Sequence, residues 1–182
     1  MVELGTPMPA FELPDPSGRI VRSADLTDGA GVLVAFICNH CPFVKHISHE
    51  LAAIGRLCEE RGVRMVGINS NDIEAYPADA PPLMAETART CGWTFPYLFD
   101  ETQAVARAFN AACTPDFFLY DRSGRLAYRG QLDDSRPDNG VPVTGRDLRA
   151  AIEAVAAGQP VPGEQRPSIG CNIKWKPEHA GG

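Results

Sequence analysis

The sequence predicts an α/β fold in which helices flank a central mixed β-sheet. Two strand signals, at 32–37 and 63–69, enclose a helical pattern at 42–61. A strand–helix–strand unit of this length makes its two strands parallel neighbours joined by a right-handed crossover. Later, apolar residues on both sides of the turn at 121–124 predict an antiparallel hairpin. Parallel and antiparallel neighbours together make the sheet mixed.

The first core strand and the helix after it have clear hydrophobic patterns. Val32 to Ile37 is a continuous apolar run, typical of a buried strand. The residues after it place apolar side chains at spacings of three and four, which form one helical stripe. Pro42 suits a first helical turn, and Gly62 suits a helix stop. The stripe consists of Val44, Ile47, Leu51, Ile54 and Cys58.

Turn signals organise the segments on either side of this unit. Residues 1–26 carry prolines and the turn Asp15-Pro16-Ser17-Gly18, which predicts an N-terminal hairpin extension. The stretch 69–82 is rich in Asn, Asp and Pro and is long for a compact domain, so it is a candidate functional loop. A short helix at 82–91 and a short strand at 95–99 follow.

The second half of the chain is predicted from cap signals. Residues 100–103 have the form of a capping box, and the helix after them is expected to turn Val105, Ala108 and Phe109 inward. A last helix spans 144–157. Residues 159–182 then form an irregular tail rich in Pro and Gly, which we expect to pack on the single domain of residues 1–158.

Composition excludes several classes of protein. With 182 residues, 44% of them hydrophobic, the chain suffices for one well-buried domain. Its net charge of -6 and scattered basic residues provide no electrostatic footprint for nucleic acid or an anionic membrane. No apolar run is long enough to span a bilayer, and the N-terminus lacks the features of a signal peptide. We therefore expect a cytoplasmic protein; the sequence does not indicate an oligomeric state.

A Cys-x-x-Cys pair lies where the first core strand meets its helix. The N–H groups and dipole of a helix start stabilise a thiolate there and lower its pKa. The motif is expected to place Cys38 at this positive end, with His40 adding a positive or proton-donating group. Such a thiol, followed three residues later by Cys41, suits disulfide exchange, in which one sulfur attacks and the other resolves the mixed disulfide.

The order of elements and three motifs resemble a known family. Thr114-Pro115 opens a later strand, as in the thioredoxin fold. The N-terminal pattern of Gly5, Pro9, Phe11, Leu13, Asp15 and Gly18 resembles the alkyl hydroperoxide reductase/thiol-specific antioxidant branch, and the dithiol and tail motifs resemble its peroxiredoxin-like redoxins. The resemblance implies that Cys38 is the nucleophile and Cys41 the resolving thiol. It also implies that Thr114 and Pro115 pack against the dithiol and shape the substrate groove, with Pro42 as a supporting residue.

A peroxidase register competes with this assignment. In peroxiredoxins a threonine precedes the peroxidatic cysteine by three positions, which would make Cys41 peroxidatic and put Cys38 at the threonine. Val34 replaces the upstream proline, and Thr114-Pro115 stands where the peroxide-activating arginine is expected. Peroxide needs hydrogen bonds from the threonine hydroxyl and from the arginine as its O–O bond breaks, and this chain has neither at the expected position. Disulfide exchange is therefore favoured over peroxidase activity.

Metal delivery and a non-catalytic interaction domain are further alternatives. Cys-x-x-Cys-Pro with a nearby His resembles copper-delivery proteins, and thiolates select Cu(I) or zinc, but the cysteine spacing is one residue shorter here. Cys113 and Cys171 are candidates for extra redox thiols. The favoured function is a thiol–disulfide oxidoreductase that needs no cofactor beyond its dithiol. Its expected partners are protein disulfides and an upstream thiol reductant.

Overall fold

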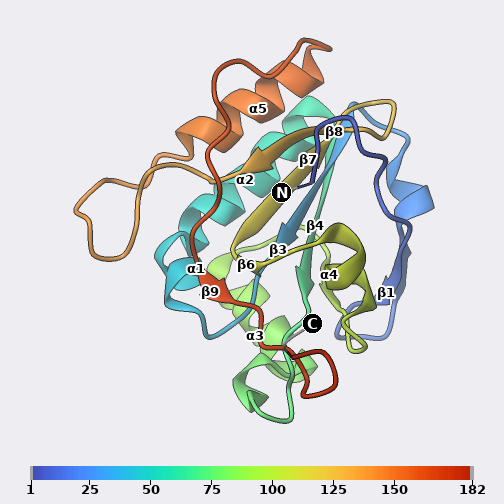
Figure 1. Cartoon of the computed structure of the whole chain (residues 1–182), viewed down its shortest axis with the longest axis vertical. Coiled ribbons are helices and arrows are strands. Elements are labelled where there is room, and N and C mark those ends of the chain that lie inside the picture. Colours follow the sequence, from blue (N-terminus) through green and yellow to red (C-terminus); the bar gives the residue numbers. More distant parts are fainter. Residues whose placement is uncertain (1, 181–182) are drawn as a thin grey trace.

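The structure is a computed structural model that describes residues 2–180. Its centre is a five-stranded sheet in the order β5-β4-β3-β7-β8 (Figure 1). The strands β3 and β4 pair in parallel, as do β4 and β5, whereas β7 is antiparallel to both β3 and β8. This confirms the predicted mixed sheet. The strands are β3 (Gly31–Phe36), β4 (Val63–Asn69), β5 (Tyr97–Phe99), β7 (Asp116–Tyr120) and β8 (Leu126–Gly130).

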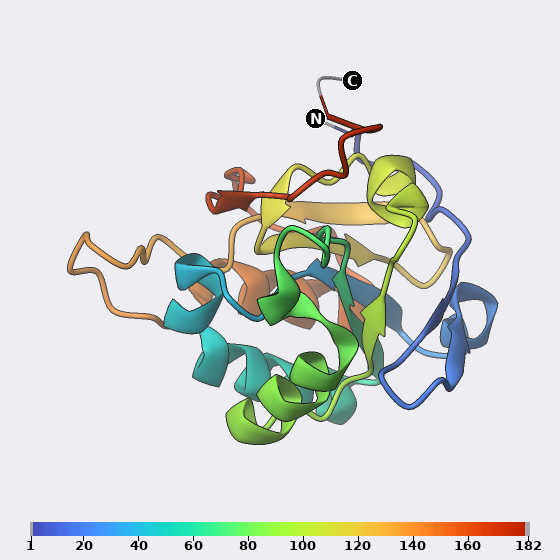
Figure 2. The ribbon, with the colours of Figure 1, turned by 90° about the horizontal axis from the view of Figure 1, so that it is seen from below.

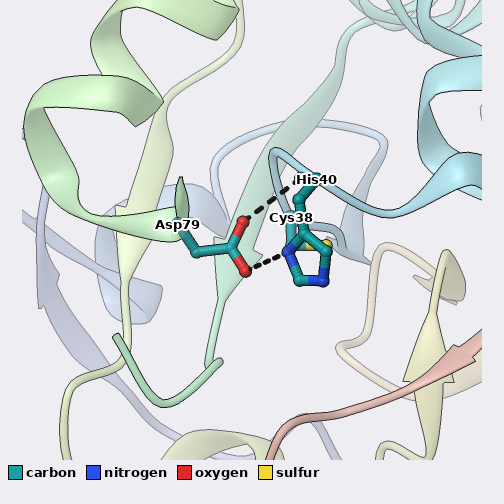
Figure 3. A group of neighbouring side chains, drawn as sticks. All are labelled: Cys38, His40 and Asp79. Carbon is teal, nitrogen blue, oxygen red and sulfur yellow. Dashed lines mark hydrogen bonds and ion pairs between the residues drawn. The ribbon is translucent and has the colours of Figure 1, made fainter. Parts of the chain in front are cut away.

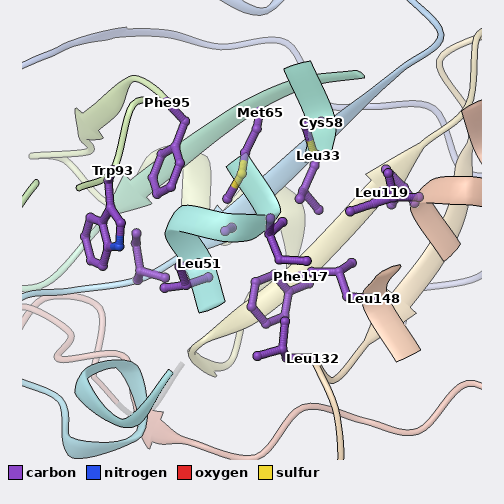
Figure 4. Packing of buried hydrophobic residues seen from close by; sticks show 14 of the residues in the cluster. Leu33, Leu51, Cys58, Met65, Trp93, Phe95, Phe117, Leu119, Leu132 and Leu148 are labelled. Atoms are coloured by element: carbon purple, nitrogen blue, oxygen red, sulfur yellow. The ribbon is translucent and has the colours of Figure 1, made fainter. Parts of the chain in front are cut away.

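Both faces of this sheet are covered, which explains the continuous apolar run of β3. Along β3, Leu33 and Ala35 join the core on one face, and Val34 and Phe36 join the core on the other. Because successive strand residues point to opposite faces, a strand buried on both sides needs apolar side chains throughout. Figure 4 shows the first of these cores, where Leu33 and Phe117 of the sheet pack with helix residues.

Different elements cover the two faces (Figures 1 and 2). The first face packs against α2 (Ser48–Arg61), α3 (Pro81–Cys91) and α5 (Arg146–Ala156). The second packs against α4 (Ala104–Phe109) and the N-terminal extension, whose β1 (Glu12–Pro14) and β2 (Ile20–Arg22) form an antiparallel hairpin. In the described part of the chain, every helix is too short or too polar to cross a bilayer.

The helix predicted at 42–61 is interrupted. It consists of α1 (Pro42–His46) and α2, which are separated by Ile47 with φ −108° and ψ 12°. Ile47 itself stays buried, so the apolar stripe runs across the break without a change of phase. A stripe of side chains reports burial and not backbone hydrogen bonding, and the sequence pattern therefore missed the interruption.

The capping box predicted at 100–103 is wrong in its second half. The Asp100 carboxylate does cap α4, because it accepts the backbone N–H groups of Val105 and Ala106. Gln103 instead has a left-handed backbone, with φ 65°, and its side chain turns away from the cap. Ala106, rather than the expected Ala108, joins the buried face of α4.

Two short elements place the tail beside the dithiol. The strand β6 (Cys113–Thr114) leads into the cis peptide bond between Thr114 and Pro115, and β7 begins at the next residue. The tail contributes β9 (Cys171–Asn172), which pairs antiparallel with β6. Two 3-10 turns, η1 (Ser23–Leu26) and η2 (Pro77–Asp79), complete the fold, and η2 lies in the long loop after β4.

Candidate redox site

Both sulfurs of the Cys-x-x-Cys pair lie against Thr114. Cys38 follows β3, and Cys41 is the N-cap residue of α1. The Cys38 Sγ is 3.7 Å from the Thr114 hydroxyl oxygen, and the Cys41 Sγ lies 3.3 Å from the Thr114 carbonyl oxygen. The side chains of Cys38 and Cys41 are buried, with residue exposures of 1% and 0%. The structure therefore brings together the dithiol and the Thr114-Pro115 turn.

Hydrogen bonds within the reduced site lower the pKa of Cys41. The Cys38 thiol hydrogen-bonds to the Cys41 sulfur and lowers the pKa of Cys41 to about 4, against the opposing effect of burial. Cys171, Thr114 and the backbone N–H of Val44 contribute further hydrogen bonds that stabilise the Cys41 thiolate. This is the pattern expected when a thiolate sits at the first turn of a helix among hydrogen-bond donors.

Cys38 has the opposite environment. Its pKa is raised by its hydrogen bond to Cys41, by burial and by the negative charge of Asp79. The sequence placed Cys38 at the positive end of the helix dipole, and this expectation was wrong. The helix begins at Pro42, so the stabilisation of a helix N-terminus acts on the N-cap residue Cys41.

His40 forms a hydrogen bond with a buried carboxylate (Figure 3). Its Nδ1 lies 2.5 Å from Asp79 Oδ2, at the end of η2. A carboxylate acceptor at this distance requires the proton on Nδ1, so Asp79 sets the tautomer of the ring and leaves Nε2 free. The Cys38 Sγ, a His40 ring nitrogen and an Asp79 carboxylate oxygen all lie within 4.8 Å of one another.

Asp79 was not identified from the sequence. It is fully buried, and its Oδ1 accepts the backbone N–H groups of Asn39 and His40 at 2.8 and 3.3 Å. Its Oδ2 also accepts a hydrogen bond from the Asn71 side chain at 2.9 Å. The loop 69–82 was singled out as functional, but nothing in its composition distinguishes Asp79 from the other acidic residues there. Asp79 holds the Cys-x-x-Cys backbone in place as well as the His40 ring.

An aromatic ring stacks on the His40 imidazole. Tyr76 stacks on His40 with ring centroids 5.5 Å apart and an interplanar angle of 10°. The Lys174 ammonium of the tail lies 5.6 Å from the centre of the same Tyr76 ring. The long loop and the tail therefore meet over the imidazole, and the His40 side chain keeps only 27% of its surface exposed.

The two other candidate thiols differ in position. Cys171 lies against Cys41, and burial together with its hydrogen bond to Cys41 raises the pKa of Cys171 to about 11. Cys113 points toward the carbonyl oxygens of Pro115 and Ser168, at 3.5 and 3.8 Å. Burial and the charge of Asp116 raise the pKa of Cys113 to about 12. Of these two cysteines, Cys171 is the one in contact with the dithiol.

Among residues 2–180, the group of side chains placed closely enough to hold a copper or zinc ion is Cys38, His40 and Asp79. Their spacing within 4.8 Å is compatible with a shared ion. However, His40 Nδ1 and Asp79 Oδ2 already share a hydrogen bond, and Asp79 accepts three more from Asn39, His40 and Asn71. An ion bound between these groups would break the short His40–Asp79 contact. The donor set therefore fits a hydrogen-bonded proton site better than a metal site.

Comparison with known proteins agrees with this geometry. The sequence matches the AhpC/TSA family over residues 4–129, more than half of the chain and including the dithiol and Thr114-Pro115. The chain belongs to the AhpC/TSA family. As the mixed sheet and flanking helices indicate, its fold is thioredoxin-like. The predicted resemblance to redoxins of the peroxiredoxin-like branch is confirmed.

The similar proteins include one named as a thiol-disulfide oxidoreductase and one named as a peroxiredoxin. An uncharacterized conserved protein from Geobacillus kaustophilus is 54% identical, with a TM-score of 0.94, over 97% of this chain and 94% of that one. The thiol-disulfide oxidoreductase ResA of Geobacillus thermodenitrificans is 27% identical over 69% of this chain and 67% of its own. The 1-Cys peroxiredoxin PER1 of Zea mays is 25% identical over 84% of this chain and 71% of its own length.

Proposed function

We propose that this AhpC/TSA-family protein is a thiol–disulfide oxidoreductase whose redox couple is Cys38–Cys41. The observation that carries the proposal is the buried Cys38–Cys41 dithiol, whose sulfurs lie 3.7 Å from the hydroxyl oxygen and 3.3 Å from the carbonyl oxygen of Thr114. A thiolate with a second thiol already hydrogen-bonded to it is arranged to form and break one disulfide. The likeness to ResA supports this chemistry at the family level.

In the proposed reaction, Cys41 attacks and Cys38 resolves. The Cys41 thiolate attacks one sulfur of a substrate disulfide, forming a mixed disulfide and releasing the other sulfur as a thiolate. Cys38 then loses its proton and attacks Cys41, which releases the second substrate thiol and leaves the Cys38–Cys41 disulfide. His40, whose ring Asp79 orients next to Cys38, is the group that accepts this proton. The dithiol carries both electrons, so no organic cofactor is required.

This assignment reverses the roles inferred from the resemblance, where Cys38 attacked. The reversal rests on the pKa of about 4 for Cys41 and on the raised pKa of Cys38. Thiolates and not thiols are nucleophiles, and the better leaving group in the reverse reaction is also the sulfur of lower pKa. Protein disulfides and an upstream thiol reductant remain the proposed partners.

Trapping the mixed disulfide tests the proposal. Reduced protein is mixed with native, disulfide-bonded insulin. Covalent adducts are separated on a non-reducing gel and identified by peptide mass. Cys38→Ser combined with Cys171→Ser should accumulate an adduct at Cys41, because both neighbouring thiols that could resolve it are gone. Cys41→Ser combined with Cys171→Ser should accumulate little. An adduct confined to Cys38 would contradict the assignment of roles.

A thiol peroxidase is the second candidate, and one observation favours it. The low-pKa sulfur is Cys41, which is the position that the peroxidatic register assigns. Within residues 2–180, however, the groups that hydrogen-bond to Cys41 are thiols, Thr114 and a backbone N–H, and none is an arginine. Stopped-flow oxidation by hydrogen peroxide separates the candidates: a peroxidase loses thiolate faster with peroxide than with a small disulfide at equal concentration.

A further inference from the structure

The tail occupies the strand edge beside the redox site. In β6–β9, Thr114 pairs with Cys171 and Cys113 pairs with Asn172 in antiparallel register (Figure 1). An extended substrate that docked on the Thr114-Pro115 turn would add to this same edge by main-chain hydrogen bonds. The edge is already filled by residues of the chain itself, and both active-site cysteines are buried.

Gly170 lets the tail approach the turn closely. A Cβ atom added at Gly170 would lie 2.0 Å from the Thr114 carbonyl oxygen and 3.1 Å from Pro115 Cδ. The first distance is much shorter than a van der Waals contact. The atom it involves belongs to the Thr114 backbone, which cannot rotate away as a side chain would. On the same stretch, the Ser168 hydroxyl donates to the Pro115 carbonyl oxygen at 2.5 Å. The tail is fitted to the turn on both sides of Gly170.

Residues beyond β9 hold the tail on the fold. Ile173 is 3% exposed and packs in the core on the α4 face of the sheet. The Lys174 N–H donates to the Asn71 side chain, and the Lys174 carbonyl accepts the backbone N–H of Asp72. Gln103 donates to the Lys174 carbonyl at 2.9 Å and accepts the Lys176 N–H at 3.0 Å. This explains why Gln103 turns away from the helix cap.

Seated in this way, the tail presents a thiol to the nucleophile. Cys171 pairs with Thr114, and the Thr114 carbonyl oxygen lies 3.3 Å from the Cys41 Sγ, so the pairing holds the Cys171 thiol beside the nucleophile. We propose that the tail is an internal substrate strand: it closes the redox site, and Cys171 exchanges with Cys41 to form a Cys41–Cys171 disulfide. The inference rests on the proposed function, since it uses the same Cys41 chemistry.

The exchange step is balanced without an added oxidant. Starting from the Cys38–Cys41 disulfide, the Cys171 thiolate attacks the Cys41 sulfur. The Cys41–Cys171 bond forms, the Cys38–Cys41 bond breaks, and Cys38 leaves as a thiolate that takes a proton. One disulfide is exchanged for another, so no net electrons move. Starting instead from a mixed disulfide at Cys41, the same attack releases the substrate thiol.

The test uses 2,2′-dipyridyl disulfide at pH 5, where a thiol of low pKa reacts selectively and each exchange releases one coloured pyridine-2-thione. In Cys38→Ser, we expect Cys41 to release one equivalent at pH 5. After excess reagent is removed and the pH is raised to 8, where more of Cys171 is thiolate, Cys171 should release a second equivalent as it displaces the pyridyl group. Peptide mass mapping should then find Cys41 linked to Cys171. Cys38→Ser with Cys171→Ser should release one equivalent and keep the adduct. Cys38→Ser with Cys113→Ser, the matched control on β6, should behave as Cys38→Ser alone.

The two proposals fail differently. If Cys38→Ser releases one equivalent and its Cys41 adduct persists, the internal-substrate inference is overturned and the proposed function stands. If Cys38→Ser shows no fast first release, both are overturned. Gly170→Ala in the Cys38→Ser background supplies a variant that keeps every thiol. Because overpacking a close contact disfavours the seated tail, the second release should slow by about tenfold or more. The exposed neighbour change Ile169→Ala should leave it unaltered.

Discussion

His40 Nδ1 and Asp79 Oδ2 lie 2.5 Å apart although the two residues are separated by 39 positions in the chain. The contact joins the Cys-x-x-Cys turn to the long loop after β4, and it places a buried carboxylate near the Cys38 sulfur. One residue of the loop thereby orients the imidazole and sets part of the electrostatic environment of the dithiol.

Removing the charge of Asp79 should lower the pKa of Cys38. The hydrogen bond to Cys41 and burial raise that pKa first, and the Asp79 charge adds to them. Asp79→Asn keeps the shape of the side chain and an oxygen that accepts the Asn39 N–H. We expect the alkylation of Cys38 by iodoacetamide, followed by peptide mass mapping so that the other thiols are counted separately, to accelerate at lower pH in Asp79→Asn than in the wild type. An unchanged pH profile for Cys38 in Asp79→Asn would contradict the assigned role.

The Cys41 thiolate should persist in the reduced protein down to about pH 4. Its pKa is lowered from 9.0 to about 4, chiefly by the Cys38 hydrogen bond. A thiol whose pKa is depressed on folding stabilises the fold fully above its unfolded pKa, and this stabilisation is lost as pH falls through the folded pKa. The contribution of Cys41 to the free energy of unfolding should therefore rise between about pH 4 and pH 9. Denaturant unfolding of the wild type should show the rise, and Cys41→Ser should lack it.

Thr114→Val should slow the first exchange. The Thr114 hydroxyl hydrogen-bonds at the dithiol and lowers the pKa of both sulfurs. Valine keeps the branched shape but cannot donate, and a lost hydrogen bond of this kind corresponds to a rate decrease of roughly twofold to tenfold. The rate of pyridine-2-thione release at pH 5 measures it. Thr114→Ser retains the hydroxyl and should recover most of the rate; equal rates in the valine and serine variants would argue against the hydrogen bond.

Gln103→Ala should loosen the tail without removing a thiol. The Gln103 side chain is fully buried, and its amide binds the backbone of Lys174 and Lys176. Leaving these groups without a partner should destabilise the protein by about 1–3 kcal/mol. Trypsin cleavage after Lys174 should become faster, as followed by mass spectrometry of the intact chain. Gln159→Ala, an exposed glutamine change, serves as the control and should leave cleavage unaltered.

Local sequence patterns determined the fold class and the position of the dithiol. The apolar run of β3, the stripe across 42–61 and the turn signals near Gly124 depend on neighbouring residues, and the predicted βαβ unit and the β7–β8 hairpin are both present. The same logic failed at Ile47 and Gln103. There, a side-chain pattern does not reveal where the backbone leaves the helix or which distant groups a buried amide binds.

The division of charge within the site was decided by tertiary structure. The sequence identified Cys38, His40, Cys41, Thr114 and Pro115, but it assigned the thiolate to Cys38 and not to Cys41. Which sulfur has the lower pKa depends on where α1 begins and on hydrogen bonds from remote segments, including those from Thr114 and Cys171. Asp79 reaches His40 and Cys171 reaches Cys41 only because the loop and the tail fold back on the dithiol. Contacts between distant parts of a chain leave no periodic signal, so the motif was readable from the sequence and its electrostatics were not.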